Sequence, residues 1–461
     1  MAKVVVLLGE EIHPFCHPLD LVEFQESARS SNLLFLKTLF SQAIALGLLG
    51  IFSTLTLAPA DDKAAADQFL AGVLETNPGV AAARLDWEAM AERPEIVASL
   101  PDPMVSYGYY FTSVQTRTGA MRQRFGVSQR IPFPGKLGTA KALSAADAQV
   151  AYWRFRATLR DVFAQGRLLL ADLYRADGTL HVLRAQDELF RQTTNSARGL
   201  VESNQGTLAN VIRAQIAAEE IGTRIAQVEA ERTGVIAKMG ALRGEVEPSV
   251  TLPRFADPQL PPLPTLVDVM RRSLVTNQEL EAARAAVVRD ELGIRAAALE
   301  YFPDITLGAD YTTIDASTVL PMTPQNGEDP ILGTVSMNVP IWWDKLGAQK
   351  RAAQARRGSS AARQAQLAAD VSAKVQAAHA LARAMREQRD RFASAIIPGA
   401  RQAYQSTVSG YSTGGTSLTD LLDVMRAYLG AELGLIDRTA GYLRSMAELE
   451  RAVGEPLEKN K

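Results

Sequence analysis

Two carboxylates near the C-terminal end of the chain, Asp420 and Asp423, are the residues best placed to do chemistry. They lie three residues apart, so a helix would present both on one face. Such a pair attracts cations, because like charges at close range must be screened or partly protonated. A plainer interpretation is that both aspartates cap or solvate the start of a helix. The spacing alone leaves both interpretations open.

Catalytic and metal-binding patterns are not evident elsewhere. The single cysteine, Cys16, and two of the four histidines, His13 and His17, lie near the N-terminus, while His181 and His379 are far apart. A metal site built from His and Cys is therefore not expected. The sequence also shows no Ser-His-Asp order and no phosphate-binding loop. We predict a protein that is not an enzyme and that needs no cofactor.

The composition narrows the class of protein further. A chain of 461 residues is too long to fold around one ordinary hydrophobic core, so two or three structural units are expected. A hydrophobic content of 47% is an ordinary globular value, which excludes a bundle of many membrane-spanning helices. The net charge of -2, with both signs interspersed, excludes nucleic acid as a partner, since that would need a basic stripe.

The N-terminal residues indicate targeting rather than a folded unit. Lys37 precedes an apolar run that extends from Thr38 to Leu57 and ends in Ala58-Pro59-Ala60. A positive charge, an apolar segment and small residues at a cleavage site are typical of a secretory signal. A membrane anchor is the alternative, but polar residues and glycines within the run favour cleavage. No cysteine lies near Ala60, so a lipid anchor is not expected.

The rest of the chain repeats one plan. Short matches recur in the same order in both halves: Thr76-Asn77 with Thr276-Asn277, Ala82-Ala83-Arg84 with Ala282-Ala283-Arg284, Pro103 with Pro303, Val127-Ser128 with Val335-Ser336, Ile131-Pro132 with Val339-Pro340, and Lys136-Leu137-Gly138 with Lys345-Leu346-Gly347. A proline-rich stretch separates the halves and cannot be helical. We therefore predict an extension with a signal (1–60), a first repeat (61–247), a linker (248–264), a second repeat (265–457) and a tail (458–461).

Each repeat is predicted to contain a short helix, two strands and long helices. The short helices fall at 79–98 and 278–300. No proline lies between Pro134 and Pro248, and apolar residues there follow alternating spacings of four and three, as in a coiled coil. A helix over 139–200 would be about 90 Å long at 1.5 Å per residue. A tube or a bridge needs such a rod, whereas a globular domain does not.

Four runs have the alternation of strands. The first, from Met104 to Ser113, places Val105, Tyr107, Tyr109 and Phe111 on one face, and the runs around 125–131, 304–312 and 331–339 repeat this pattern. Such runs are typical of strands with lipid on one side and water on the other. A soluble sandwich would show the same alternation. Four strands cannot close a membrane barrel, so copies of the chain would have to share their strands.

Three stretches carry a family resemblance: Ser128 to Leu137, Val339 to Leu346, and the tract from Ile397 to Leu457. With the duplicated plan, they make residues 64 to 457 similar to the TolC family of outer-membrane efflux channel proteins. The Pro-Phe-Pro-Gly-Lys motif is similar to the heavy-metal branch. The resemblance implies a mainly α protein with a small transmembrane β part. It also implies a homotrimer, in which a 12-stranded outer-membrane β-barrel, with four strands per chain, continues as a periplasmic coiled-coil α-barrel.

The resemblance also implies a function. The chain would be the outer-membrane exit duct of a tripartite efflux system in a Gram-negative-type bacterium. Its partners would be outer-membrane lipid, a periplasmic adaptor and an inner-membrane pump. A periplasmic adaptor or coiled-coil scaffold, and a type I secretion exit channel, are the alternatives. The sequence does not indicate which cargo is exported, so metal ions, drugs and polypeptides all remain candidates.

The closed end of the duct can be placed on the sequence by the same resemblance. The helix-hairpin tips would contain Gly206, Thr207, Gly414 and Gly415, which would contact the adaptor, although a turn without a partner needs the same glycines. Tyr411 would latch the closed end, and Asp420 and Asp423 would ring the pore. The family latch can include a basic residue five positions after the tyrosine, where this chain has Thr416. The first-half counterpart of Asp420 is Asn210, which cannot carry charge. We therefore expect hydrogen bonds and packing around Tyr411 to hold the closed end, rather than a salt bridge.

Overall fold

The computed structural model describes residues 62–204, 206–246, 260–322 and 324–457. The predicted extension (1–60), the tail (458–461) and most of the linker lie outside the described residues. The chain divides into two compact units, Met1–Ala71 and Gly72–Lys461. The described part of the first unit consists of residues from helix α3 (Asp62–Thr76).

Two similar series of elements make up the second unit. The first contains α4 (Pro78–Ala98), β1 (Met104–Tyr109), β2 (Gln115–Thr116), β3 (Gly119–Ile131), α5 (Lys136–Glu202) and α6 (Leu208–Leu242). The second contains α7 (Leu266–Thr276), α8 (Gln278–Leu299), β4 (Ile305–Ala316), β5 (Ile331–Met337), α9 (Trp343–Arg391), η1 (Phe392–Ile396), α10 (Ile397–Ser412) and α11 (Leu418–Val453). The mainly α fold with a small sheet is confirmed. Helix α7 and the two-residue strand β2 were not predicted.

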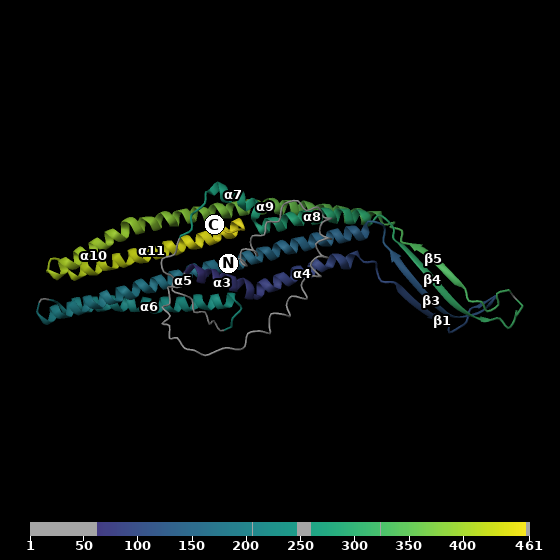
Figure 1. Cartoon of the computed structure of the whole chain (residues 1–461), viewed down its shortest axis with the longest axis horizontal. Coiled ribbons are helices and arrows are strands. Elements are labelled where there is room, and N and C mark those ends of the chain that lie inside the picture. Colours follow the sequence, from purple (N-terminus) through teal and green to yellow (C-terminus); the bar gives the residue numbers. More distant parts are fainter. Residues whose placement is uncertain (1–61, 205, 247–259, 323, 458–461) are drawn as a thin grey trace, which may run out of the picture. The chain divides into compact units, whose positions relative to one another are not determined.

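The long helices form two hairpins that run side by side (Figure 1). Helix α5 has 67 residues and packs against α6, while α11 packs against α9 and α10 and also along α5. Most of the predicted coiled-coil seam is buried, including Leu173, Leu183 and Phe190. Of these, Leu183 and Phe190 share one core with Leu421 and Met425 of α11. Burial of each large apolar side chain contributes about 1.5–3 kcal/mol, so the seam holds the hairpins together.

A proline lies inside the second hairpin without ending its helix. Pro398 occupies the first turn of α10, directly after the π-helical turn η1. Proline lacks an N–H and its ring crowds the preceding turn, which a straight α-helix accommodates poorly. The wider π turn, in which the Ile397 N–H donates to the Phe392 carbonyl, admits this ring. The chain therefore stays helical from Trp343 to Ser412.

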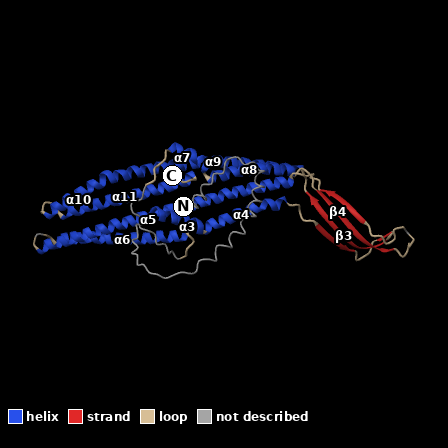
Figure 2. Ribbon diagram, viewed as in Figure 1, coloured by secondary structure: helices blue, strands red, loops and turns tan. Residues whose placement is uncertain are grey.

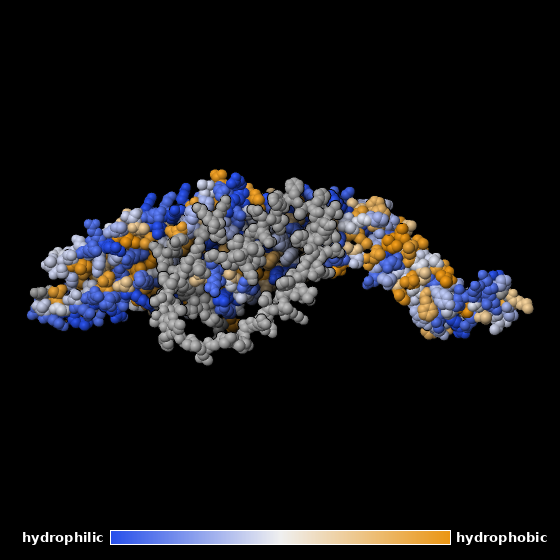
Figure 3. All heavy atoms as spheres, viewed as in Figure 1, coloured by the Kyte–Doolittle hydropathy of each residue, from blue (hydrophilic) through white to orange (hydrophobic). Residues whose placement is uncertain are grey.

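The strands form one antiparallel sheet at the end of the helices opposite the hairpin turns (Figure 2). The order is β1-β3-β4-β5, and β2 pairs with β3 as a short extension. The register places Phe125 opposite Tyr311 and Val127 opposite Ala309, so apolar residues share one face as the sequence predicts. Figure 3 shows hydrophobic residues gathered on the part of the sheet that adjoins the helices, and hydrophilic residues at the loops beyond.

The opposite face of the sheet is polar and its charges are paired. Arg124 contacts Asp310 at 2.7 Å across β3 and β4, and Arg122 pairs with Asp315 further along. Gly126 lies beneath the first pair, where a Cβ would come within 2.5 Å of Asp310 Oδ1. Glycine therefore leaves room for polar side chains to lie flat over the strand.

Asp304 joins the sheet to the helices. It lies between α8 and β4, and its side chain is only 4% exposed. Its carboxylate accepts hydrogen bonds from Arg130, from the Phe133 N–H at 3.0 Å and from Lys136 Nζ at 2.9 Å. Its backbone N–H donates to Asn338 Oδ1. One side chain thus connects the end of β3, the start of β4 and the start of α5.

These contacts also set the charge state of Asp304. Burial by itself raises the pKa of this carboxyl, but the hydrogen bonds from Arg130, the Phe133 N–H and Lys136 outweigh it and lower the pKa to about 2. Asp304 is therefore ionised at neutral pH.

Among the described helices, none is both long and apolar enough to cross a membrane.

Candidate functional site

The first hairpin turns between α5 and α6. Asn204 adopts a left-handed φ of 58°, which reverses the chain after Ser203. A Cβ on Gly206 would come within 3.1 Å of the backbone of Leu200, so glycine allows the close approach of the turn to α5. Thr207 caps α6, since its hydroxyl accepts a hydrogen bond from the Asn210 N–H at 3.3 Å. Both predicted tip residues therefore have roles within the turn.

The second hairpin turns between α10 and α11. Gly414 takes the left-handed conformation, with φ of 76°. The N–H of Gly415 donates to the Gly410 carbonyl at 2.7 Å, and the Thr416 hydroxyl donates to the Thr407 carbonyl at 3.1 Å. The Thr416 side chain thus forms its hydrogen bond with α10 of the same chain, near the end of that helix.

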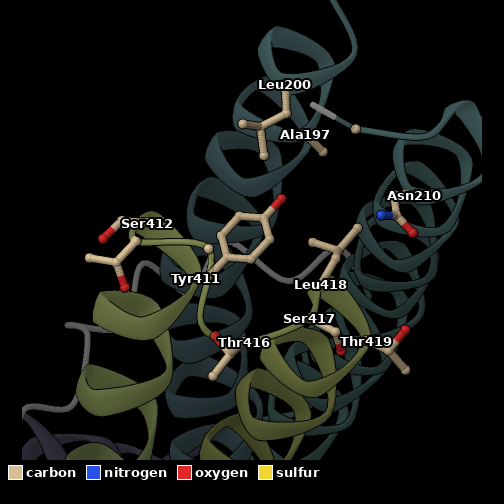
Figure 4. Close-up of a pocket in the computed structure, with 12 residues that line it drawn as sticks. Ala197, Leu200, Asn210, Tyr411, Ser412, Thr416, Ser417, Leu418 and Thr419 are labelled. Atoms are coloured by element: carbon tan, nitrogen blue, oxygen red, sulfur yellow. The ribbon is translucent and has the colours of Figure 1, made fainter. Parts of the chain in front are cut away.

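Tyr411 points into a groove that lies between the two tips. The groove has a volume of about 430 Å³ and is lined from both hairpins by Ala197, Leu200 and Asn210 on one side and by Tyr411, Thr416 and Leu418 on the other. The ring extends from α10 towards α5 (Figure 4) and packs against the core that the two hairpins share. Burial raises the pKa of its hydroxyl. Within the described residues this hydroxyl has no hydrogen-bond partner, so packing holds Tyr411 inside the chain.

Asp420 begins α11 and completes a capping box. Ser417 Oγ accepts from the Asp420 N–H at 3.1 Å, and the Ser417 N–H donates to Asp420 Oδ2 at 3.3 Å. The Ser417 hydroxyl also donates to the same carboxylate oxygen at 2.7 Å. The carboxylate nonetheless stays exposed at the tip. Asp420 therefore has the capping role that the sequence left open, and its carboxylate is in contact with water.

Asp423 lies on the same exposed face of α11, away from the buried Leu421 and Leu422. Its carboxylate is 3.6 Å from Arg426 Nη1, one turn further along the helix. Arg426 Nη2 is also 3.6 Å from Glu220 of α6. One arginine therefore offsets part of the negative charge at this face and connects the second hairpin to the first.

A second arginine spans the same seam between α6 and α11. Arg213 Nη1 donates to the Thr419 hydroxyl at 3.3 Å. The sequence patterns did not single out either arginine. Arg426 could have been noticed, since it follows Asp423 by three residues and so must lie beside it on a helix. Arg213, Glu220 and their partners are about two hundred residues apart in sequence, and no local pattern pairs them.

The tips therefore carry carboxylates, hydroxyls and two bridging arginines. Exposed carboxylates in this arrangement can attract cations. Across the described part of the chain, no three His, Cys, Asp or Glu side chains gather closely enough to hold a metal ion. The site is suited to electrostatic attraction and to packing against another surface.

Comparisons with known proteins bear on the family and on the fold. The family model for outer membrane efflux proteins matches residues 269–455, most of the second repeat. None of the curated protein sequences matches this chain.

Several solved structures have the same fold. The outer-membrane channel OprN is 16% identical, with 85% of this chain and 90% of that chain covered and a TM-score of 0.73. CusC, whose structures concern folding and transmembrane channel formation, is 15% identical over 85% of this chain and 92% of its own, with a TM-score of 0.70. The outer membrane protein VceC from Vibrio cholerae is 15% identical over 86% and 97%, also with a TM-score of 0.70. The three scores are close, so the fold does not favour one branch over another.

Proposed function

We propose that three copies of this chain form the exit duct of a tripartite efflux system, since the family model for outer membrane efflux proteins matches most of its second repeat. Each copy would contribute its sheet to one wall in the outer membrane and its two helical hairpins to a tube in the periplasm. The duct is passive, since cargo would be selected and driven by an inner-membrane pump.

One observation carries this proposal. A single sheet presents an exposed apolar face and, on the reverse, a polar face of paired charges such as Arg124 and Asp310. That division fits lipid on one side and water on the other. A sheet in a soluble sandwich would instead bury its apolar face against a second layer, and the described elements supply no such layer. The polar face continues from the sheet towards the helices through the Asp304 junction.

The hairpin tips are the proposed contact with the periplasmic adaptor. They present backbone and small polar side chains from Gly206 and Thr207 on one hairpin and from Gly414 and Gly415 on the other. The groove of about 430 Å³ between them is open to a partner. An adaptor or coiled-coil scaffold as the identity of this chain is less well supported, because such a protein needs no sheet with an exposed apolar face.

The gate of the duct is proposed to lie at Tyr411, Asp420 and Asp423. Three copies would place six carboxylates around one axis, where a ring of like charge favours cations and can be blocked by them. Tyr411 supports closure by packing between the hairpins, with its hydroxyl left for a neighbouring copy. The pairing of Asp423 with Arg426 makes the ring weaker than its six formal charges suggest.

Reconstitution of the mature chain tests the proposal. Membrane fractionation should recover an outer-membrane oligomer that requires detergent, and planar bilayers should show low conductance that divalent cations reduce further. Replacement of Asp420 and Asp423 by Asn should abolish the block by cations, whereas Asp437→Asn, on the same helix further from the tip, should leave it unchanged. Recovery of a water-soluble monomer would refute the duct. Cation block that survives the double replacement would refute the ring alone.

A further inference from the structure

Helix α9 carries a row of cations along one face. The helix begins shortly after β5 and runs from the sheet towards the hairpin tips (Figure 1). Lys345, Arg356, Arg363 and Lys374 follow one another at intervals of eleven, seven and eleven residues. These intervals are about three, two and three helical turns, so the four side chains form one stripe about 44 Å long. We call this row the α9 stripe.

The cations of the α9 stripe have no counter-ions. All four residues are exposed, and none has an ion pair in the described part of the chain. The carboxylates of the neighbouring helix α8 are engaged elsewhere. Asp290 pairs with Arg289 at 2.7 Å and accepts a hydrogen bond from Ser360. Glu291 pairs with Arg357 at 2.9 Å.

One carboxylate lies on the same face as the α9 stripe. Asp370 is between Arg363 and Lys374, and it accepts a hydrogen bond from Gln366 at 2.8 Å. Four cations and one carboxylate leave this face of α9 with an excess of positive charge.

Two sets of contacts show which way the α9 stripe faces. On the polar side of the sheet, Asp304 contacts Lys136 at the start of α5. Lys345 is the counterpart of Lys136 in the second repeat, so the stripe begins where the same polar side reaches α9. On the other side, His379 lies about 160° around the helix from Arg363, and its Nε2 is 3.0 Å from the Pro264 carbonyl oxygen. The segment before α7 therefore covers the side opposite the stripe.

The internal repeat does not account for the α9 stripe. At the same distances from Lys136 at which α9 has Arg356 and Lys374, helix α5 has Asp147 and Gln165. The run of cations therefore belongs to the second repeat alone. A face that has only to be solvated needs no excess of one sign, since both signs interspersed serve equally well.

We propose that the α9 stripe binds organic anions inside the duct, with carboxylate or phosphate groups as the parts that it recognises. This inference rests on the proposed function, in which the polar side of the sheet and the helix faces that continue from it enclose the lumen. Arginine pairs with carboxylate and phosphate oxygens through two N–H groups at once.

The spacing of the cations suits this role. Arg356 and Arg363 are about 10.5 Å apart along the helix, which is close to the Debye length of about 10 Å at 0.1 M salt. Their fields therefore overlap at low ionic strength and are screened at high ionic strength. The tips, with Asp420 and Asp423, attract cations, whereas the part of the tube next to the sheet attracts anions.

Binding of carboxyfluorescein, an anionic dye with two carboxylates, tests the α9 stripe. The oligomer in an uncharged detergent should raise the fluorescence anisotropy of the dye, and this binding should weaken as salt is added. Combined replacement of Arg356, Arg363 and Lys374 by Gln should lower the affinity at least about tenfold, because the dye loses most of its opposing charge.

A matched control lies on the other side of the same helix. Lys350, Arg383 and Arg386 are exposed and lie within about 40° of His379 around α9. Their combined replacement by Gln removes the same formal charge but should change the affinity for the dye by less than about twofold. Equal losses in the two triple variants, or no loss when the stripe is neutralised, would overturn the proposal.

Ion selectivity gives a second readout, one that a general loss of folding would not reproduce. The background Asp420→Asn with Asp423→Asn removes the carboxylates at the tips. In planar bilayers on that background, neutralising the α9 stripe should lower the ratio of chloride to potassium permeability at least about threefold, whereas the control triple variant should not. An unchanged ratio would overturn the stripe, whereas a wild-type chain that forms no membrane oligomer would refute the proposed function itself.

Discussion

Replacement of Asp304 by Asn should weaken the junction where the sheet meets the helices. Asn keeps the size of the side chain and one acceptor oxygen for the Phe133 N–H, but it removes the charge that Arg130 and Lys136 contact. The change therefore isolates the electrostatic part of the junction. No apolar packing is lost, and the strand register around Ile305 should persist.

The magnitude follows from the burial of the partners. Removal of one partner from a buried ion pair costs about 3–5 kcal/mol. Asp304 and Lys136 are 4% and 13% exposed, but Arg130 is 57% exposed and water screens its share. We expect a loss of about 2 kcal/mol in the free energy of unfolding at neutral pH. The lowered pKa of Asp304, about 2 against an ordinary 3.8, indicates a similar size.

The dependence on pH gives the sharper result. Because the pKa of Asp304 is lower in the folded state, its charge stabilises the folded state above about pH 4, and this contribution is lost as the pH falls through about 2. Guanidinium unfolding in detergent, followed by circular dichroism, should show a gap of about 2 kcal/mol between wild type and Asp304→Asn at neutral pH that narrows towards pH 2.

A matched control is available on α4. Asp86 is exposed and has no ion pair in the described part of the chain, so Asp86→Asn should change the free energy of unfolding by less than about 0.5 kcal/mol. If the gap for Asp304→Asn is absent at neutral pH, or stays constant down to about pH 2, the electrostatic account of the junction is wrong.

Four further changes test other parts of the molecule. Phe190→Ala should lower the free energy of unfolding by about 3–5 kcal/mol in chemical denaturation, because the ring is 1% exposed in the shared core. Gly434→Ala should cost about 1–3 kcal/mol, since a Cβ there overlaps the Phe392 ring, and thermal melts should show recovery when Phe392→Leu is added. Arg426→Gln should strengthen cation block up to about fivefold in planar bilayers, as the two carboxylates that it contacts lose their counter-ion. Arg160→Met should leave the free energy of unfolding unchanged or raise it by about 1–4 kcal/mol. Burial lowers the pKa of this arginine to about 10, and two of its nitrogens lack partners in the described residues. A lower free energy of unfolding would contradict this expectation.

Local patterns predicted the elements well where period and composition agree. The alternation in 104–113 and 304–312 predicts strands, and the structure has β1 over Met104–Tyr109, shorter than predicted, and β4 over Ile305–Ala316. The proline-free stretch with a coiled-coil seam predicts a helix over 139–200, and α5 spans Lys136–Glu202. Patterns of this kind suffice because side chains that share one face lie two residues apart in a strand and three or four residues apart in a helix.

Pro398 shows the limit of a local rule. A proline inside a helix removes a backbone hydrogen bond and usually ends or kinks the helix, yet the helix continues through Pro398 by way of a π turn. The packing of Phe392 against Gly434 of α11 supplies contacts at that turn that lie outside any local window. Tertiary contacts can thus make an irregular turn acceptable where propensity alone ends the helix.

The sequence by itself determined which face of each strand is apolar, where the hairpins turn, that Asp420 and Asp423 share a face and that the chain is built from two copies of one plan. Only the tertiary structure decided which charges meet: Asp304 with Lys136, and Arg426 with Glu220. The reason is physical. A periodic pattern involves residues that are only a few places apart in the sequence. An ion pair instead depends on two side chains that only the folded hairpins and the sheet register bring within a few ångströms of each other.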